Sequence, residues 1–354
     1  MHHAFLWAPT AILRTGRAFA MSQEAEMSSR IDTTELVVSP SEFFQIGKTE
    51  RIRQSVEITL SDHSYLPKAD DPRADWVASV AVPAFKTLAQ MGFLAPKFCT
   101  IGTGAGLDVL AAVEILRSRS VGFTDLHEDV LEHARQNIRG NLLAQDIELI
   151  GGAGDILAPL AGKVEQVDVV YENLPNIPMA GVGDLDDGQT SSTFIEERSE
   201  EVPGFAEKNL VTLHYLALQQ AHPILRVGGR VLSSIGARVP LSEILALSSA
   251  AGYNGGILTY TWKIQSEPLD VVGGYARWER EGLGPFHFYP VDVLREVFAG
   301  LTVAAAGAQA LQLEKELAPH EISAVDALTR VERGEKVGHT VAILDSVKIP
   351  DSAL

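Results

Sequence analysis

Short apolar runs alternate with longer amphipathic segments through the middle of the chain. Between runs rich in β-branched residues, apolar side chains recur at the spacing of one helix face. We expect strands over 98–102, 120–124, 146–150 and 166–171, and helices over 106–118 and 128–140. Strands that alternate with helices predict a parallel sheet with helices on both faces and right-handed crossovers.

The same pattern continues toward the C-terminus. Segment 207–225 is expected as a helix, 228–240 as a glycine turn followed by the fifth strand, and 241–253 as the next helix. Residues 300–354 are expected to contain a strand, a helical link and a closing strand. The predicted fold class is therefore α/β, with a mostly parallel sheet of seven strands.

Outside this core we expect three further parts. Residues 1–40 are expected to be either disordered or an over-extended start of the chain, with Met21 as the functional initiator. An N-terminal helical element with a cover for the site occupies 41–92, and the α/β core 93–254. Residues 255–299 form an aromatic-rich insertion, and the long acidic loop 178–205 is interpreted as a flap or a surface insertion.

A glycine-rich turn follows the first strand of this core. The stretch FCTIGTGAG places Gly102, Gly104 and Gly106 at alternate positions directly before a helix. Glycine permits positive φ and removes the Cβ atom that would keep a ligand away from the backbone. Free N–H groups at the start of the helix favour a carboxylate or phosphate. The turn is therefore a candidate ligand-binding loop.

Acidic and amide side chains stand at the ends of the next three strands. Asp125 ends the second strand about 20 residues after the glycines, Asp155 ends the third, and the turn YENLPNIP (171–178) ends the fourth. Ligands of open parallel sheets bind at the carboxyl ends of the strands. These residues are therefore expected to line one site.

Because of this glycine turn and these strand-end residues, the segment from residue 75 to 250 resembles the class I S-adenosylmethionine (SAM) dependent methyltransferases. The resemblance implies SAM as the cofactor and a methyl transfer to a small molecule, an amine or amino-acid-like acceptor, in secondary metabolism. It implies a set of SAM-binding residues. In this set the glycine loop binds the methionine part, Asp125 binds ribose, and the Gly154-Asp155 pair lies beside adenine. That set is Gly102, Thr103, Gly104, Gly106, Asp125, Leu126, Gly154, Asp155, Ile156 and Asn173.

Two departures from the family pattern stand in the sequence. The family usually has an acid two residues before the first glycine, where this chain has Thr100, and Asp108 is a possible substitute for the ammonium contact. A dinucleotide-binding loop spaces its second and third glycines more widely than GTGAG does, so that alternative is less favoured.

The turn after the fourth strand is the segment expected to carry the reaction. Many methyltransferases that act on nitrogen have Asn-Pro-Pro-Tyr there, and this chain retains Asn173 and Pro175. The resemblance implies that Asn173 accepts hydrogen bonds from the target amine. Tyr171 presents an aromatic face to a sulfonium, and Glu172 could hold an ammonium or take its proton. These three are the candidate catalytic residues.

Two other functions remain open. The ENLPNIP turn and the aromatic insertion are also similar to azetidine-2-carboxylate synthases, in which the amino nitrogen of SAM attacks its own γ-carbon and expels methylthioadenosine. Tyr215 and Ser234 would then hold the folded methionine part. A protein that binds SAM without catalysis is the second alternative.

Aromatic residues suggest an acceptor pocket. Tyr65 lies near His63 in a proline-interrupted loop before the core, and Trp262 belongs to the aromatic insertion. With Tyr215 and Ser234 they are the candidate pocket residues. The clustered aromatics of the insertion could alternatively form a homodimer interface or pack as ordinary core.

Composition narrows the remaining possibilities. A formal net charge of -17, with 46 acidic and 29 basic residues, disfavours a nucleic-acid partner. The single cysteine, Cys99, excludes a disulfide within one chain, and a cytoplasmic location is expected. No apolar run is long enough for a membrane helix, and the ten histidines show no paired ligand spacing, so no metal is expected.

Overall fold

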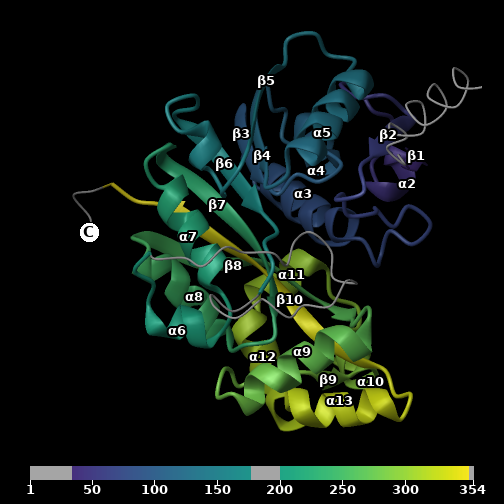
Figure 1. The fold of residues 1–354 in the computed structure, drawn as a ribbon, viewed down its shortest axis with the longest axis vertical. Coiled ribbons are helices and arrows are strands. Elements are labelled where there is room, and N and C mark those ends of the chain that lie inside the picture. Colours follow the sequence, from purple (N-terminus) through teal and green to yellow (C-terminus); the bar gives the residue numbers. More distant parts are fainter. Residues whose placement is uncertain (1–33, 177–199, 351–354) are drawn as a thin grey trace, which may run out of the picture.

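A mixed β-sheet forms the centre of the computed structural model, which describes residues 34–176 and 200–350 (Figure 1). Its strands are β3 (Lys97–Ile101), β4 (Ser120–Asp125), β5 (Glu148–Ala153), β6 (Val167–Glu172), β7 (Leu225–Ala237), β8 (Tyr253–Ile264), β9 (Tyr289–Pro290) and β10 (Val337–Lys348). The strands stand side by side in the order β5-β4-β3-β6-β7-β10-β8, and short β9 pairs with β10.

The direction of the strands divides the sheet in two. β5, β4, β3, β6 and β7 run parallel to one another, whereas β10 is antiparallel to both β7 and β8. The α/β class and the mostly parallel sheet expected of a class I methyltransferase-type fold are confirmed. With short β9 the sheet has eight strands, against the seven that were predicted.

Helices cover both faces of the sheet, as Figure 1 shows. On one face lie α3 (Val82–Gln90), which continues a π-helical turn (Val77–Ala81), α4 (Leu107–Ile115) and α5 (Glu128–Asn141). Phe85, Leu110 and Ile138 belong to the apolar core on that face. The other face is covered by α6 (Gly204–Lys208), α7 (Thr212–Ala221) and α8 (Leu241–Ala250), with Leu216 and Ile244 in the second core. Burial on both faces explains why the strands read as continuous apolar runs.

The N-terminal part differs from the expected helical element. A short helix, α2 (Pro40–Phe43), is flanked by β1 (Thr34–Val38) and β2 (Val56–Leu60), which pair in an antiparallel sheet. β1 falls within the stretch predicted to be disordered. In β2 the residues with buried side chains alternate, which is the period of a strand and not of a helix. Residues 77–90 do form the helix that was predicted before the first core strand.

Helix α5 holds this small sheet against the core. The side chains of Asn137 and Asn141 accept hydrogen bonds from the backbone N–H groups of Thr59 and Glu57 at 2.8 and 3.0 Å. Each amide also donates back to a carbonyl oxygen of the same residue of β2. The two asparagines therefore satisfy β2 like a neighbouring strand, and the loop after β2 is carried to the start of α5.

The C-terminal part also differs from the prediction. β8, which was assigned to the aromatic insertion, is the edge strand of the main sheet beyond β10. The predicted strand after residue 300 is helical: α11 (Val303–Ala308) begins at Thr302, whose hydroxyl accepts a hydrogen bond from the N–H of Ala305. Its alanine-rich sequence favours a helix over a strand. The other helices here are α9 (Pro268–Arg280), α10 (Val291–Val297), α12 (Ala310–Leu317) and α13 (Ala324–Glu332).

The clustered aromatics pack on one another inside this C-terminal part. The ring of Tyr275 lies edge-on to Trp278, Phe286 and Phe288, with ring centroids 5.4, 4.9 and 5.8 Å away. Tyr275, Phe286 and Phe288 are buried. These contacts are those of a hydrophobic core, the most ordinary of the readings considered for these residues.

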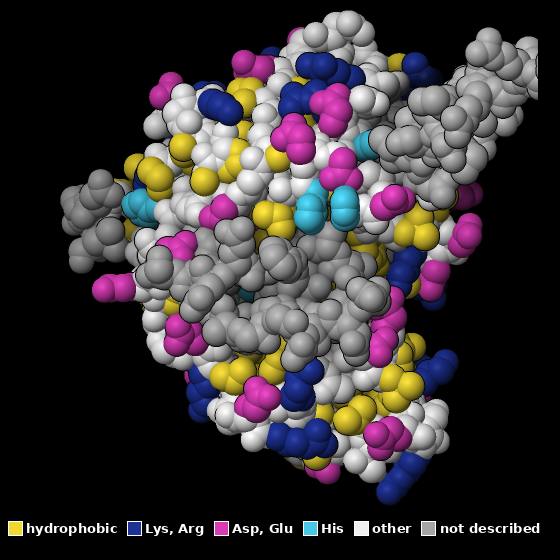
Figure 2. All heavy atoms as spheres, in the orientation of Figure 1, with side chains coloured by type: hydrophobic (Ala, Val, Ile, Leu, Met, Phe, Trp, Pro, Cys, Tyr) yellow, Lys and Arg dark blue, Asp and Glu magenta, His cyan; other side chains and the backbone are white. Residues whose placement is uncertain are grey.

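Some expectations lie outside the described residues. They are the alternative start at Met21 and most of the flap 178–205. Within the described ranges, no helix is both long and apolar enough to cross a membrane. Figure 2 shows acidic, basic and hydrophobic side chains intermingled over one face of the molecule.

Gly104 and Gly106 make different demands on the turn after β3. Both have positive φ, +54° and +83°, but a Cβ on Gly106 would lie 2.8 Å from Ile138 of α5, whereas a Cβ on Gly104 meets no atom within 4 Å. We expect Gly104→Ala to lower the free energy of unfolding by about 1–2 kcal/mol through strain alone. We expect Gly106→Ala to cost roughly twice as much, because Ile138 must also move. Urea denaturation measures both, and equal losses would contradict the packing role of Gly106.

Candidate functional site

The candidate residues meet at the carboxyl edge of the parallel strands. β4, β3, β6 and β7 are adjacent and parallel, so the turns after them open on the same side of the sheet. Such an edge, where neighbouring connections leave on opposite faces, forms a crevice that binds ligands in α/β proteins. The edge therefore combines the glycine turn, Asp125 and the turn after Glu172.

The glycine turn is built from hydrogen bonds to the neighbouring strand. The N–H groups of Gly102 and Thr103 donate to the carbonyl oxygen of Thr124 in β4, at 2.9 and 3.0 Å. Gly102 has a φ of +68°, and a Cβ added there would also meet nothing within 4 Å. The turn is thus held from the strand side, while space remains open beside Gly102 and Gly104.

Asp125 joins the turn to the end of β4. One carboxylate oxygen accepts a hydrogen bond from the N–H of Gly104 at 3.0 Å, and the other faces the N–H of His127 at 3.4 Å. Burial raises the pKa of this carboxyl group, and the bond from Gly104 opposes the shift. Each carboxylate oxygen has a further lone pair, so the group can still accept from a ligand hydroxyl. The predicted proximity of Asp125 and the glycine turn is therefore present in the structure.

The residues expected beside adenine border the same edge. Leu126, which directly follows β4, has 47% of its surface exposed. Gly154 donates its N–H to the carbonyl oxygen of Asp125, at 2.8 Å. Ile156 is buried and has a φ of +47°. The carboxylate of Asp155 accepts a hydrogen bond from Gln220 of α7 at 3.1 Å, so it is anchored to that helix.

Asp108 has a structural task within the turn. Its carboxylate accepts hydrogen bonds from the hydroxyl groups of Thr100 and Thr103, the latter at 2.8 Å, and from the N–H of Val109. Burial raises the pKa of Asp108 to about 6, against the effect of these bonds. Thr100, which replaces the acid of the family pattern, and Asp108 together fix the turn. Both oxygens of Asp108 are already engaged, which argues against the ammonium contact considered for it.

Glu172 and His214 form a buried pair at the end of β6. Oε1 of Glu172 lies 2.8 Å from Nδ1 of His214 in α7, and Oε2 accepts from the N–H of Leu174 at 3.0 Å. Both side chains are fully buried. Nε2 of His214 lies 3.4 Å from the side-chain oxygen of Asn176. The pair therefore holds the 172–176 turn by both of its ends.

The hydrogen bonds of Glu172 and His214 can be satisfied in two arrangements. If Nδ1 donates to Glu172, Nε2 of a neutral ring needs a donor, which the Asn176 amide supplies when its nitrogen and oxygen exchange places. A doubly protonated ring instead donates to Asn176 as placed and to the Glu172 carboxylate. In either state Glu172 acts on the turn, and no free carboxylate oxygen points into open space.

Asn173 and Tyr171 lie in opposite environments. Asn173 is exposed, and its side chain makes no hydrogen bond to the residues that the structure describes. Tyr171 is buried, with its ring edge-on to Phe85 at 5.3 Å. Burial raises the pKa of Tyr171 well above 10, and a nearby Ser234 hydroxyl opposes the shift. Neither of these two hydroxyl groups has a hydrogen bond of normal geometry in the described ranges.

The four candidate pocket residues come from four separate parts of the fold. Tyr65 is partly exposed in the loop before the core, and burial raises its pKa to about 12. The hydroxyl group of Tyr215 accepts from Gln219 one turn along α7. Ser234 lies inside β7, and Trp262 lies on β8 opposite Thr340. Their assignment to an acceptor pocket stays a prediction.

A buried cationic group follows the carboxyl end of β7. The guanidinium of Arg238 donates to Gln265 at 2.7 Å, contacts His339 at 3.1 Å and lies 4.9 Å from the centre of the Tyr275 ring. Arg238 is 7% exposed, and no carboxylate pairs with it in the part of the chain that is described. Burial, Arg238 and Lys263 lower the pKa of His339 well below its usual value. This half of the edge is therefore positively charged.

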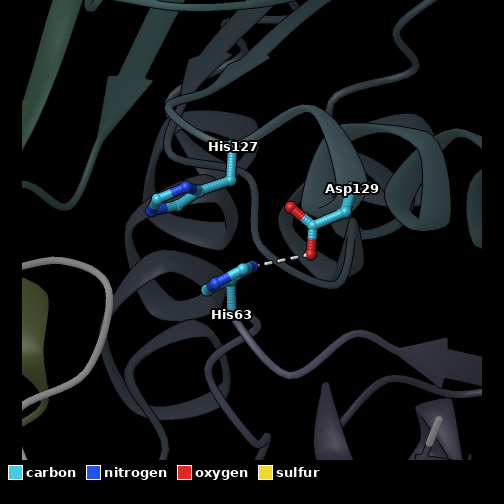
Figure 3. Close-up of side chains that lie close together, drawn as sticks. All are labelled: His63, His127 and Asp129. Carbon is cyan, nitrogen blue, oxygen red and sulfur yellow. Dashed lines mark hydrogen bonds and ion pairs between the residues drawn. The ribbon is translucent and has the colours of Figure 1, made fainter. Parts of the chain in front are cut away.

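His63, His127 and Asp129 come together at the other end of the edge (Figure 3). Nδ1 of His63 lies 2.9 Å from a carboxylate oxygen of Asp129, and the rings of the two histidines are stacked 4.8 Å apart. This group was not predicted from the sequence. The sequence prediction considered histidines paired at ligand spacing, whereas His63 and His127 come from separate elements.

Sequence reasoning also missed His214 and Arg238. His214 lies next to Tyr215, which was predicted as a pocket residue. A single histidine in an apolar helical segment does not indicate which side chain it will contact. Arg238 follows the fifth strand directly, and a basic residue at that position was the available signal.

Comparisons with known proteins give distant likenesses. No protein-family model matches the chain, and no curated protein matches it in sequence. Among solved structures, the YcgJ protein from Bacillus subtilis is 13% identical over 75% of this chain and 98% of its own, with a TM-score of 0.38. A methyltransferase from Pyrococcus furiosus is 17% identical over 56% of this chain and 81% of its own, with a TM-score of 0.37.

Geranyl diphosphate C-methyltransferase from Streptomyces coelicolor A3(2), solved with Mg²⁺, geranyl diphosphate and S-adenosyl-L-homocysteine, is 12% identical over 76% of this chain and 78% of its own, with a TM-score of 0.36.

The raised pKa of Asp108 predicts a pH-dependent stability difference. In the folded chain this carboxyl group takes up a proton near pH 6, but in the unfolded chain only near its ordinary pKa of 3.8. A raised acid pKa destabilises the folded state above it, so this cost is relieved as the pH falls through 6. Between about pH 7.5 and 5.5, wild type should gain about 1 kcal/mol of unfolding free energy relative to Asp108→Asn.

Urea denaturation of both proteins at the two pH values measures this difference. Asp292→Asn, at a surface position whose carboxylate is 91% exposed, is the matched control and should show no such gain. A difference between wild type and Asp108→Asn that does not change with pH would contradict a buried, charged Asp108.

Proposed function

We propose that the protein is a SAM-dependent methyltransferase that acts on a small molecule. The observation that carries the proposal is the hydrogen bond between Gly104 and Asp125 beside open backbone. It places a carboxylate that can accept from ribose hydroxyls against a turn with room for the methionine part. Exposed Leu126 offers an apolar surface to the adenine ring. Bound SAM supplies an electrophilic methyl group on a positively charged sulfur.

The strongly negative net charge supports a small-molecule acceptor over a nucleic acid. A cytoplasmic location and a homodimer belong to the same proposal.

Arg238 supports an acceptor with a carboxylate. A buried guanidinium without an anionic partner is costly, and a ligand carboxylate with bidentate geometry would offset the cost. Arg238 follows β7, the strand that pairs with β6, and contacts His339 on the next strand, β10. An amino-acid-like acceptor would place its carboxylate toward these residues and its amine toward Asn173.

The chain's own residues contribute mainly by aligning the acceptor amine with the methyl group. The exposed Asn173 side chain can accept a hydrogen bond from an amine and direct its lone pair. Glu172 and His214 fix the turn that carries Asn173, so they are positioning residues. The sulfonium leaving group is good, and orientation of the amine supplies most of the rate.

The cyclase alternative is favoured by one observation. The hydroxyl groups of Tyr171 and Ser234 are buried close together without normal hydrogen bonds in the described ranges. Polar atoms of this kind could hold the folded methionine part of SAM when no acceptor is present. Incubation of the protein with SAM alone, followed by mass spectrometry, separates the two reactions. Methylthioadenosine with an azetidine amino acid would identify the cyclase, whereas intact SAM supports the methyltransferase.

Asp125→Ala should abolish SAM binding. The substitution removes both the acceptor for the ribose hydroxyls and the partner of the Gly104 N–H. We expect a loss of at least about 100-fold in affinity by calorimetry, since two hydrogen bonds to a charged group are removed. Asp292→Ala is the control and should bind as wild type does. Affinity retained by a folded Asp125→Ala protein would contradict the proposed cofactor site.

Asn173→Ala should leave SAM binding intact and reduce turnover. The exposed side chain has no hydrogen bond to lose within the described residues, so the free energy of unfolding should change by less than about 0.5 kcal/mol. Turnover is followed as S-adenosylhomocysteine release with small amines and amino acids as acceptors. Exposed Asn254 on β8 provides the control, Asn254→Ala. Unchanged turnover in Asn173→Ala would show that Asn173 takes no part in the reaction. If wild type binds SAM but turns over none, a non-catalytic SAM-binding protein is favoured.

A further inference from the structure

Three potential metal ligands converge between the loop after β2 and the start of α5. One ligand atom from each of His63, His127 and Asp129 lies within 4.8 Å of the other two. Figure 3 shows the two imidazole rings facing each other and the Asp129 carboxylate beside them. The α5 asparagines that bind β2 bring the 61–64 loop to this place, so the arrangement is fixed by the fold.

His127 provides an independent sign of a missing partner. Its Nε2 atom is buried, and no hydrogen-bond partner for it is found in the described part of the chain. A buried imidazole nitrogen without a partner is costly, and binding to a cation would satisfy it. The backbone N–H of His127 meanwhile faces Asp125, which fixes the start of the helix.

From these observations we propose that His63, His127 and Asp129 bind a divalent transition-metal ion of the zinc class. Two imidazoles and one carboxylate suit Zn²⁺ and its first-row neighbours, whereas Mg²⁺ and Ca²⁺ prefer ligand sets made of oxygen. The three protein ligands leave at least one coordination position for water. The proposal does not depend on the proposed methyl transfer.

The ligands must move slightly to close on the ion. Zinc-ligand bonds of about 2.0–2.2 Å bring any two ligand atoms within about 4.4 Å of each other, and two parallel rings cannot both point at one ion. The side chains of His63 and Asp129 are 57% and 43% exposed, so both can turn. Coordination then replaces the hydrogen bond between them and supplies a partner for the His127 nitrogen.

The position of the ion implies a structural task. His127 stands two residues after Asp125, and His63 belongs to the loop of the N-terminal part. An ion bound to both ties that loop to the β4–α5 connection at the rim of the candidate cofactor site. It lies away from Asn173 in the order of strands, so it is expected to act as a clamp and not on the reacting atoms.

Titration of the full chain with ZnCl₂ tests the proposal. His2 and His3 offer a second pair of imidazoles, so all proteins carry His2→Ala and His3→Ala. Calorimetry and metal analysis after dialysis should give one Zn²⁺ per chain and no binding of Mg²⁺. His63→Ala and His127→Ala should each weaken zinc binding by at least about tenfold, because one of three ligands is lost. Asp129→Asn should weaken it while keeping the shape of the side chain.

His320→Ala is the control, since His320 is exposed on another part of the surface. It should bind zinc as the parent protein does. Thermal unfolding without metal establishes that each variant is folded, and exposed His63 gives the substitution least able to disturb the fold. Absence of zinc binding in the parent protein would overturn the proposal. So would zinc binding that persists unchanged in folded His63→Ala and Asp129→Asn.

Discussion

The candidate site depends on the hydrogen bond from the Gly104 N–H to the Asp125 carboxylate. It joins two strands of the sheet at their carboxyl ends, where each chain would otherwise leave in its own direction. The bond forms because Gly102 and Gly104 accept positive φ and turn the N–H toward β4. Asp108 and its two threonine partners complete the arrangement from the helix side. Without this bond, neither the opening beside the glycines nor the position of the carboxylate would be defined.

The strands and helices of the α/β core could be predicted from the sequence because each core strand is buried on both faces. Such strands appear as short apolar runs, and the glycine turn marks the carboxyl end of the first. The six predicted strands and helices from 98 to 171 accordingly match the structure within three residues at each end, as expected for element boundaries. Asp125 was identified for the same reason, since its distance from the glycines is set by one helix and one strand.

The N-terminal part and the side-chain partners of the site could not be predicted in this way. Segment 39–60 has apolar residues that fit a helix in part, but Val56, Ile58 and Leu60 face the core with the period of a strand. The choice is made by Asn137 and Asn141, which lie some 80 residues away. The pairing of His214 with Glu172 and of His63 with Asp129 likewise depends on contacts between distant segments. Local spacing carries no information about such partners, so the sequence predicts the frame of the site better than its side chains.

The charges along the carboxyl edge separate the two halves of the site. On the β4 side the buried groups are acids, Asp108 and Asp125, whose pKa values burial raises. On the β7 side lie two cations, Arg238 among aromatic rings and Lys263, whose pKa burial lowers to about 8; the buried acid Asp75 lies near Lys263. In a chain with 46 acidic residues, a buried guanidinium without a carboxylate partner in the described ranges is not explained by a lack of acids. A fold that needed only stability would gain from an apolar side chain there. The retained charge is therefore better explained by a ligand that brings its own negative group to this half of the edge.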